Sequence, residues 1–161
     1  TFWHEGGRKK REVQYKSGKM HGRLVEWYGN SKKHGEEAYK NGELHGRSLW
    51  WWQNGRRKTV ADYRNGKENG VFKWWWENGR VQAEVRYQVG KEEGMARWWY
   101  PNGKMQLETE YKNGHKHGKS TFWNNSGKKE WQSNYLRGEL TWVLCWDPKG
   151  RLVECPSEEE E

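Results

Sequence analysis

The chain has few aliphatic residues, and this scarcity excludes a thick hydrophobic core. Hydrophobic residues make up 32% of its 161 residues, and the mean hydropathy is −1.43. Such values approach those of disordered chains. A two-layer sandwich needs aliphatic side chains to fill the space between its sheets, and these are missing here.

The sequence also lacks the patterns of a membrane span or of a common enzyme. No hydrophobic run reaches transmembrane length, and no signal peptide is present. There is no P-loop, no Gly-x-Ser-x-Gly and no dinucleotide-binding fingerprint. We therefore expect no catalytic residue, no cofactor and no enzymatic activity. Because Thr1 already lies inside a repeat, we expect a fragment or a processed product, and the cellular compartment stays open.

Metal-binding and cysteine chemistry receive little support from the sequence. The only cysteines, Cys145 and Cys155, lack a CxxC spacing and are compatible with a disulfide or with two free thiols. Three of the six histidines recur at equivalent positions, which would lie ~10 Å apart in a stacked array. One ion cannot bridge that distance, so no metal site is expected.

What the chain does contain is a set of aromatic residues at a fixed period. It has 14 Trp and 8 Tyr. Each Tyr of the main series is followed by Gly after three residues, by a second Gly after seven and by Trp after twelve, with few exceptions. The series recurs every 24 residues at Tyr15, Tyr39, Tyr63, Tyr87, Tyr111 and Tyr135. A fixed period of this size indicates a repeat array.

The clearest unit, residues 63–86, contains two turn signals. Asn65-Gly66 and Asn78-Gly79 have the preferred central residues of a two-residue type I′ hairpin turn. The segments between them are rich in aromatic and β-branched residues, as strands are. The predicted fold is all-β: an elongated, single-layer, twisted antiparallel meander of stacked β-hairpins. Because the strands between turns are unequal in length, either strand tilt or a bulge near the second Gly must absorb the difference.

The repeat period also predicts the domain organisation. The array spans residues 1–153, with a partial first unit at 1–14 and units starting at 15, 39, 63, 87 and 111. A degenerate capping unit, 135–153, follows, in which we expect Trp142, Leu144 and Val153 to close the core. Residues 154–161 are predicted to be an acidic, disordered tail.

Strand alternation divides the tryptophans between two faces. A two-residue turn at Asn78-Gly79 would place Trp75 opposite Gln82 and Trp76 opposite Val81. Trp76 and Val81 would then belong to the core face, and Trp75 to the opposite face, among charged residues. That opposite face is either half-covered by Arg and Lys stems or forms an aromatic and cationic binding strip. The candidate binding residues are Trp27, Trp51, Trp75, Trp99, Trp123, Arg47, Lys73 and Arg97.

The repeated pattern resembles that of a known family. Tyr-x-Asn-Gly-Lys-x-His-Gly, an aromatic triplet and then Asn-Gly-Lys/Arg resembles the MORN repeat, and is closest to the bacterial variant of antitoxin-like proteins. The best matches are residues 39–55, 63–79 and 111–127. The resemblance implies β-hairpin arrays that act as scaffolds, dimerisation modules or membrane-proximal tethers. It transfers no site residue to this chain.

Composition and resemblance together favour a non-enzymatic scaffold for protein–protein binding or assembly. Antitoxin-like sequestration and self-association are two versions of this function. The formal net charge is +8, although four terminal glutamates offset part of the positive charge of the rest of the chain. A basic chain favours anionic partners. The alternative function is therefore a peripheral tether for anionic membrane lipids. Glycan binding is a weaker alternative. Interspersed acidic residues, and no basic run longer than Arg8–Arg11, argue against nucleic acid; a small-molecule substrate is not expected.

Overall fold

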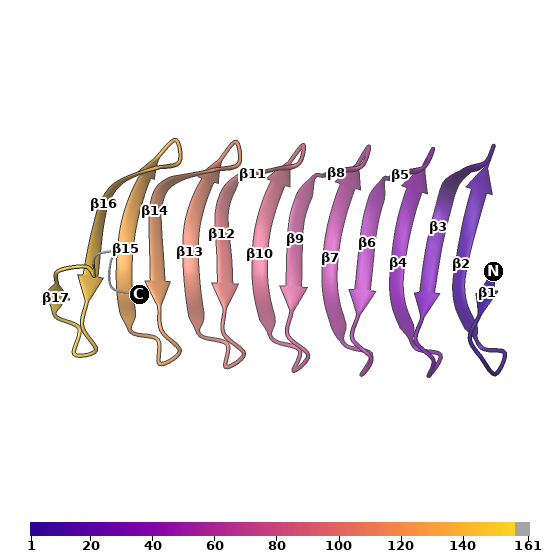
Figure 1. The fold of residues 1–161 in the computed structure, drawn as a ribbon, viewed down its shortest axis with the longest axis horizontal. Helices are drawn as coiled ribbons and strands as arrows, with labels where there is room; N and C mark the ends of the chain where they lie inside the picture. Colours follow the sequence, from indigo (N-terminus) through magenta and orange to yellow (C-terminus); the bar gives the residue numbers. More distant parts are fainter. Residues whose placement is uncertain (157–161) are drawn as a thin grey trace.

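The chain forms one long antiparallel sheet in which every strand is hydrogen-bonded to the next in sequence. The computed structural model describes residues 1–156 and contains seventeen strand segments and no helix within them. Figure 1 shows the hairpins side by side along the long axis, with the two termini towards opposite ends. The predicted all-β meander of stacked hairpins is confirmed. Within the described part, no helix is present that could cross a membrane.

The long strands alternate in direction along the array. Three long strands are each interrupted and carry two labels, β5 with β6, β8 with β9 and β11 with β12. The bounds are β1 Phe2–Trp3, β2 Lys9–Lys16, β3 Lys19–Trp27, β4 Lys33–Lys40, β5 Glu43–Leu44, β6 Gly46–Trp51, β7 Arg57–Arg64, β8 Lys67–Glu68, β9 Gly70–Trp75, β10 Val81–Gln88, β11 Lys91–Glu92, β12 Gly94–Trp99, β13 Met105–Lys112, β14 His115–Trp123, β15 Lys129–Leu136, β16 Glu139–Trp146 and β17 Leu152–Val153.

The turn that follows each Tyr is the two-residue turn that the sequence predicts. Asn65 and Gly66 have φ values of 51° and 74°, and the flanking Arg64 and Lys67 are paired. Positive φ at both central residues is the requirement of a type I′ turn. The equivalent turns lie along the upper edge in Figure 1.

One of these turns contains a residue that is unsuited to it. Val89 occupies the position held by Asn in three other units and has φ 52°. A β-branched side chain is strained in this region, whereas Asn tolerates it. We expect Val89→Asn to raise the free energy of unfolding by about 1 kcal/mol, measured by urea denaturation.

The matched control for this prediction is Val71→Asn. Val71 is also exposed, but it lies within strand β9 and has no positive φ. Because strands favour β-branched residues, this change should be neutral or destabilising. Equal stabilisation by both substitutions would contradict an explanation from turn strain.

The second turn of each unit differs from its prediction. At Asn78-Gly79 only Gly79 has a positive φ, 89°. The Gly79 N–H donates to the Trp76 carbonyl, and the Trp76 N–H donates to the Arg80 carbonyl, both at 2.8 Å. The loop therefore has three residues, as in a type I turn followed by a left-handed glycine.

The longer loop changes the register of the strands beside it. Val81 lies opposite Trp75, which the sequence analysis had paired with Gln82. Directly opposite residues share a face, so Val81 lies beside Trp75, and its assignment to the core face was wrong. The reason is the Asn78 side chain, whose Oδ1 accepts the Arg80 N–H at 2.9 Å and stabilises the three-residue loop.

A bulge near the second Gly absorbs the unequal strand lengths, as one of the two predicted solutions required. Between β13 and β14, Thr109 pairs with Ser120 and Tyr111 pairs with Lys116. One residue of β13, Glu110, therefore faces three residues of β14, 117–119. Gly118 lies inside this bulge with φ 70°, a conformation that favours glycine.

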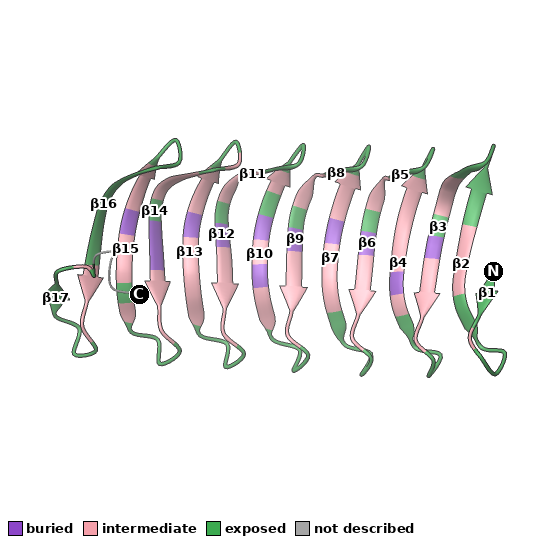
Figure 2. Cartoon of the chain, in the orientation of Figure 1, coloured by how far each residue is buried: buried purple, intermediate pink, exposed green. Residues whose placement is uncertain are grey.

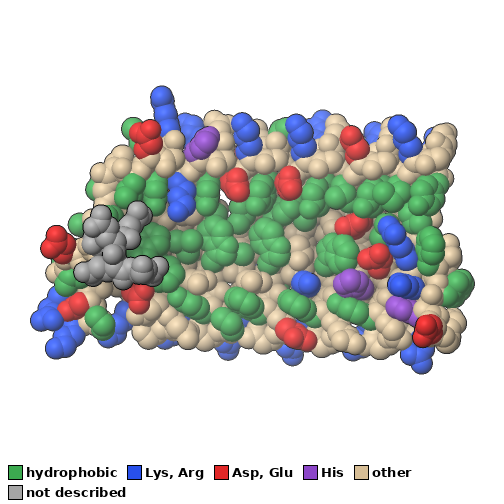
Figure 3. All heavy atoms as spheres, viewed as in Figure 1, with side chains coloured by type: hydrophobic (Ala, Val, Ile, Leu, Met, Phe, Trp, Pro, Cys, Tyr) green, Lys and Arg blue, Asp and Glu red, His purple; other side chains and the backbone are tan. Residues whose placement is uncertain are grey.

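The core is a band on one face of the sheet, which we call the inner face. Its centre is Phe72, which is 5% exposed. The Phe72 ring centroid lies 4.7 Å from that of Tyr87, 5.2 Å from Tyr63 and 5.9 Å from Trp74. Figure 2 shows buried residues in the middle of successive strands, and Figure 3 shows hydrophobic side chains gathered in a band along the array. No second layer covers this band within residues 1–156.

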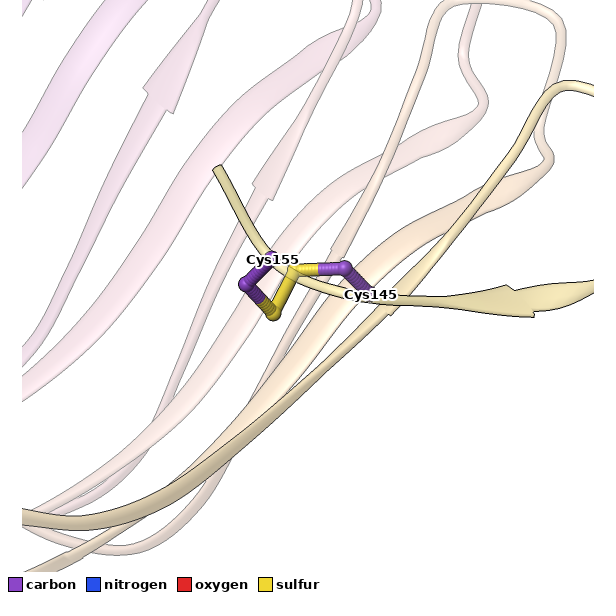
Figure 4. Close-up of a disulfide and its surroundings, with 2 residues drawn as sticks. All are labelled: Cys145 and Cys155. Carbon is purple, nitrogen blue, oxygen red and sulfur yellow. A yellow bond between two sulfur atoms is a disulfide. The ribbon is translucent and has the colours of Figure 1, made fainter. Parts of the chain in front are cut away.

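At the C-terminal end of the array a disulfide links β16 to the residues after β17, but hydrophobic side chains there remain exposed. Cys145 and Cys155 form a disulfide with their Cα atoms 5.2 Å apart (Figure 4). The residues expected to close the core, Trp142, Leu144 and Val153, are 39%, 39% and 43% exposed. Strand β17 pairs only with the last two residues of β16, so it does not cover Trp142 and Leu144. The terminal part of the predicted tail, 157–161, lies outside the described residues.

Candidate binding surfaces

The five candidate tryptophans are brought together into one row, which we call the outer Trp ladder. Trp27, Trp51, Trp75, Trp99 and Trp123 each end a long strand at the lower edge of the sheet in Figure 1. All five are half-buried. The ladder faces away from the inner face because strand neighbours point to opposite sides.

Cations from the preceding unit cover part of the ladder. Lys9 lies over Trp27 and Lys33 over Trp51, each 5.7 Å from the ring centroid. Arg57 lies 5.9 Å from the ring centroid of Trp75. These contacts correspond to the half-covered alternative, in which aliphatic stems and positive charges lie against the indoles.

The three candidate cations are engaged in cross-strand ion pairs. Each lies opposite an acidic residue of the next strand. The pairs are Arg47–Asp62 at 3.3 Å, Lys73–Glu84 at 3.0 Å and Arg97–Glu108 at 2.6 Å. This arrangement leaves a partner fewer free charges than the sequence suggested.

A second aromatic ladder, which the sequence analysis did not identify, bonds neighbouring units together. The indole N–H of Trp52 donates to the Trp75 carbonyl, and that of Trp76 donates to the Trp99 carbonyl, both at 3.0 Å. The Tyr28 hydroxyl donates to the Trp51 carbonyl at 2.8 Å. The sequence contains a signal for this ladder, because every aromatic residue at this position is Trp or Tyr, and none is Phe.

The inner face presents an apolar band with neutral phenol groups along it. Burial, then the hydrogen bond that the Tyr39 hydroxyl donates to Glu37 at 2.8 Å, raises the pKa of Tyr39 to about 12. Burial also raises the pKa values of Tyr63, Tyr87 and Tyr111. These hydroxyls are therefore protonated at neutral pH and can donate hydrogen bonds to a ligand.

The arrangement contains no evident centre for chemistry. Among residues 1–156, no group of three His, Cys, Asp or Glu side chains is placed to hold a metal ion. The surfaces available to ligands are instead long and repetitive: the inner aromatic band, the outer Trp ladder and the edges of the sheet.

Comparison with known families agrees with this architecture. Residues 68–88 and 92–113 match the family described as MORN repeat variant. No curated protein matches the chain. The matched segments cover the central units, and the same 24-residue period continues on both sides of them. Residues 68–113 of this chain are therefore MORN repeats of the variant type, as the resemblance implied.

Proposed function

We propose that the protein is a non-enzymatic scaffold that holds a segment of a partner protein along its inner aromatic band. MORN repeats commonly mediate protein or membrane-lipid interactions and form a non-enzymatic repeat family. The observation that carries the proposal is the single-layer sheet, which leaves a continuous row of Tyr and Trp rings without a covering element in the described chain.

The chemistry of the inner face suits a protein ligand better than that of the outer ladder. Tyr and Trp dominate the energetic centres of protein interfaces, since they combine a large apolar area with a polar group. The tyrosines Tyr63, Tyr87 and Tyr111 supply rings with free hydroxyl protons. The outer tryptophans, in contrast, share their surface with cations, and Arg47, Lys73 and Arg97 are paired with carboxylates. Sequestration of the antitoxin kind is one form of this function.

Two matched sets of variants distinguish the faces. A partner is first captured from the source cell with the tagged protein, identified by mass spectrometry and purified. We expect Tyr63/Tyr87/Tyr111→Ser to weaken its binding at least about thirtyfold, since loss of one interface hot spot costs 2 kcal/mol or more. The triple Phe variant should retain most of the affinity, because the apolar band remains.

The control is the outer triple variant Trp51/Trp75/Trp99→Ser. Under the proposal it binds the purified partner as the unaltered protein does, with an unchanged far-UV spectrum. Loss of binding in this variant, together with retention in the tyrosine-to-serine variant, would instead assign the partner to the outer ladder.

Self-association is a second candidate function, and the C-terminal strand favours it. Leu140, Trp142, Val143 and Leu144 of β16 are all exposed. Strand β17 pairs only with Cys145 and Trp146, so within residues 1–156 no strand lies on the outer side of residues 139–144. An exposed apolar edge strand is a template for pairing with another chain.

A charge on this edge tests the second candidate. We expect Val143→Lys to shift the protein to the monomer in analytical ultracentrifugation, because edge lysines oppose strand addition. Val71→Lys, at an exposed position inside the sheet, is the control and should leave the oligomeric state unchanged. A monomeric unaltered protein at all concentrations would eliminate this candidate.

A further inference from the structure

The three-residue loops lie along the lower edge of the sheet (Figure 1), and each is followed by one basic residue. The residue that follows the left-handed loop residue, which is a glycine in every case but Ser31, is basic from the partial first unit to the fifth full unit. All of these side chains are exposed. Successive units repeat after two strands, so the cations lie ~10 Å apart. This basic edge consists of Arg8, Lys32, Arg56, Arg80, Lys104 and Lys128.

Each of these cations is held in place on the next loop. Arg56 Nη1 donates to the Glu77 carbonyl at 3.3 Å, and Arg80 Nη1 donates to the Pro101 carbonyl at 3.2 Å. The Arg56 stem lies against the next loop: a Cβ built on Gly79 would be in ordinary contact with Arg56 Cδ, at 3.5 Å. The line of charges is therefore ordered before any ligand arrives.

The positive charges of the basic edge are not neutralised by the protein. Over residues 1–156, none of the six cations lies within 4.0 Å of a carboxylate oxygen. A hydrogen bond to a carbonyl of the next loop needs an N–H donor and does not need a charge. Loop stacking therefore does not require the charge, which leaves it available to an anionic ligand.

The outer Trp ladder runs beside the basic edge, and within residues 1–156 two of its tryptophans, Trp99 and Trp123, have no covering cation from the preceding unit. At Trp51 and Trp75 the preceding unit supplies a covering cation, Lys33 or Arg57. The equivalent residue before Trp99 is Val81. A hollow of about 570 Å³ lies there, lined by Lys73, Gly79, Arg80, Val81, Glu84, Trp99 and Gly103. An aromatic surface and an unneutralised cation of the basic edge thus share one hollow.

We infer that this side of the array binds single-stranded nucleic acid, with phosphates along the basic edge and a base against Trp99. Proteins that bind single strands combine a line of cations for the backbone with aromatic side chains for the bases. The sequence analysis argued against nucleic acid because acidic residues are interspersed along the chain and the longest basic run has four residues. The fold instead aligns cations that are one unit apart in sequence. The loops on this edge from β3 to β15 carry no large exposed apolar residue to insert into a membrane.

The test is binding of fluorescein-labelled oligothymidylate, followed by anisotropy at several salt concentrations. Six phosphate contacts predict a slope of log K against log salt of about −4 for a single strand. Arg56/Arg80/Lys104→Gln removes three charges while keeping polar N–H donors, and should make the slope shallower by about 2. The control is Lys40/Arg64/Lys112→Gln on the opposite edge, which removes the same charge and should change the slope by less than half as much.

Two further variants test the base contact separately. Trp99→Leu should weaken binding about fivefold to a hundredfold with an unchanged slope, as loss of one stacked base does. Val81→Lys adds a positive charge and is expected to place a cation over Trp99, as Lys33 and Arg57 cover Trp51 and Trp75. At high salt, where the added charge contributes little, it should weaken binding, whereas a purely electrostatic surface would bind as well or better.

Several results would overturn the inference. These are no binding of the oligonucleotide at low salt, equal effects of the two glutamine variants, or unchanged affinity in both Trp99→Leu and Val81→Lys. Binding to vesicles that contain anionic lipid, without binding to the oligonucleotide, would assign the basic edge to a membrane. The inner-face tyrosine variants should bind the oligonucleotide normally, so this inference and the proposed protein scaffold can fail independently.

Discussion

Replacement of Phe72 by alanine is expected to lower the free energy of unfolding by about 3–5 kcal/mol. Phe72 is buried at the centre of the array and contacts Tyr63, Trp74 and Tyr87. The single-layer sheet offers few neighbouring side chains that could move into the space. The loss therefore includes both the transfer free energy of the ring and the cavity left behind.

The form of the unfolding transition should change as well. In a repeat array each unit contacts only its neighbours, so stability is a sum of unit and interface terms. A destabilised unit at residues 63–86 would lie between two folded segments of similar length. We expect the urea transition of Phe72→Ala to become broader or to separate into two steps, as followed by far-UV circular dichroism.

Leu24→Ala is the matched control for the central lesion. Leu24 occupies the equivalent position in the first full unit and is 1% exposed. Its loss should cost about 2–5 kcal/mol locally but should leave the remaining units as one cooperative block. Equal broadening by both variants would show that position in the array does not matter and would contradict nearest-neighbour coupling.

The second large effect is expected from a methyl group added at Gly35. Gly35 is buried opposite Trp50, and a Cβ there would lie 2.8 Å from a carbon of the Trp50 ring. Trp50 is itself held by a 3.0 Å hydrogen bond from its indole N–H to the Ser48 hydroxyl. We expect Gly35→Ala to destabilise the protein by about 1–3 kcal/mol, the usual cost of overpacking, measured by urea denaturation.

A second glycine isolates the steric cause. Neither Gly29 nor Gly35 has a positive φ, and nothing lies within 4 Å of a Cβ built on Gly29. Gly29→Ala should therefore be neutral or stabilising by up to about 1 kcal/mol, because alanine restricts the unfolded chain. The double variant Gly35→Ala/Trp50→Phe should recover part of the lost stability. If Gly29→Ala were as harmful as Gly35→Ala, the cause would be backbone conformation instead of the indole contact.

The turns show what can be predicted from this sequence and what cannot. At Asn65-Gly66 the dipeptide alone predicts a type I′ turn, and both residues adopt positive φ. At Asn78-Gly79 the same dipeptide forms a three-residue loop. The difference arises beyond the turn itself, since the Asn78 amide also donates to the Pro101 carbonyl of the next unit at 2.9 Å. A local rule cannot include a partner that lies 23 residues away.

The candidate site was predictable in its pattern and not in its contacts. The 24-residue period correctly places Trp51, Trp75 and Trp99 in one row. Their exposure depends on side chains from the preceding unit, such as Arg57 over Trp75, and on the register set by the loop. The pairing of Cys145 with Cys155 was likewise open, because it depends on how the last hairpin folds back. The sequence shows that Trp52 and Trp76 carry indole N–H donors, but it does not show which carbonyls accept their hydrogen bonds.

The side-chain hydrogen bonds of the second aromatic ladder all point the same way along the chain. Trp52 donates to the carbonyl of Trp75, and Trp76 to that of Trp99. The units that begin at Tyr39, Tyr63 and Tyr87 therefore each have one donor and one acceptor of the same kind, like identical links in a chain. A duplication or loss of one whole 24-residue module would leave no link unmatched, whereas a shorter insertion would break the series. The number of 24-residue repeats can thus set the length of the array in steps of one unit, while the sequence of the individual hairpin stays the same.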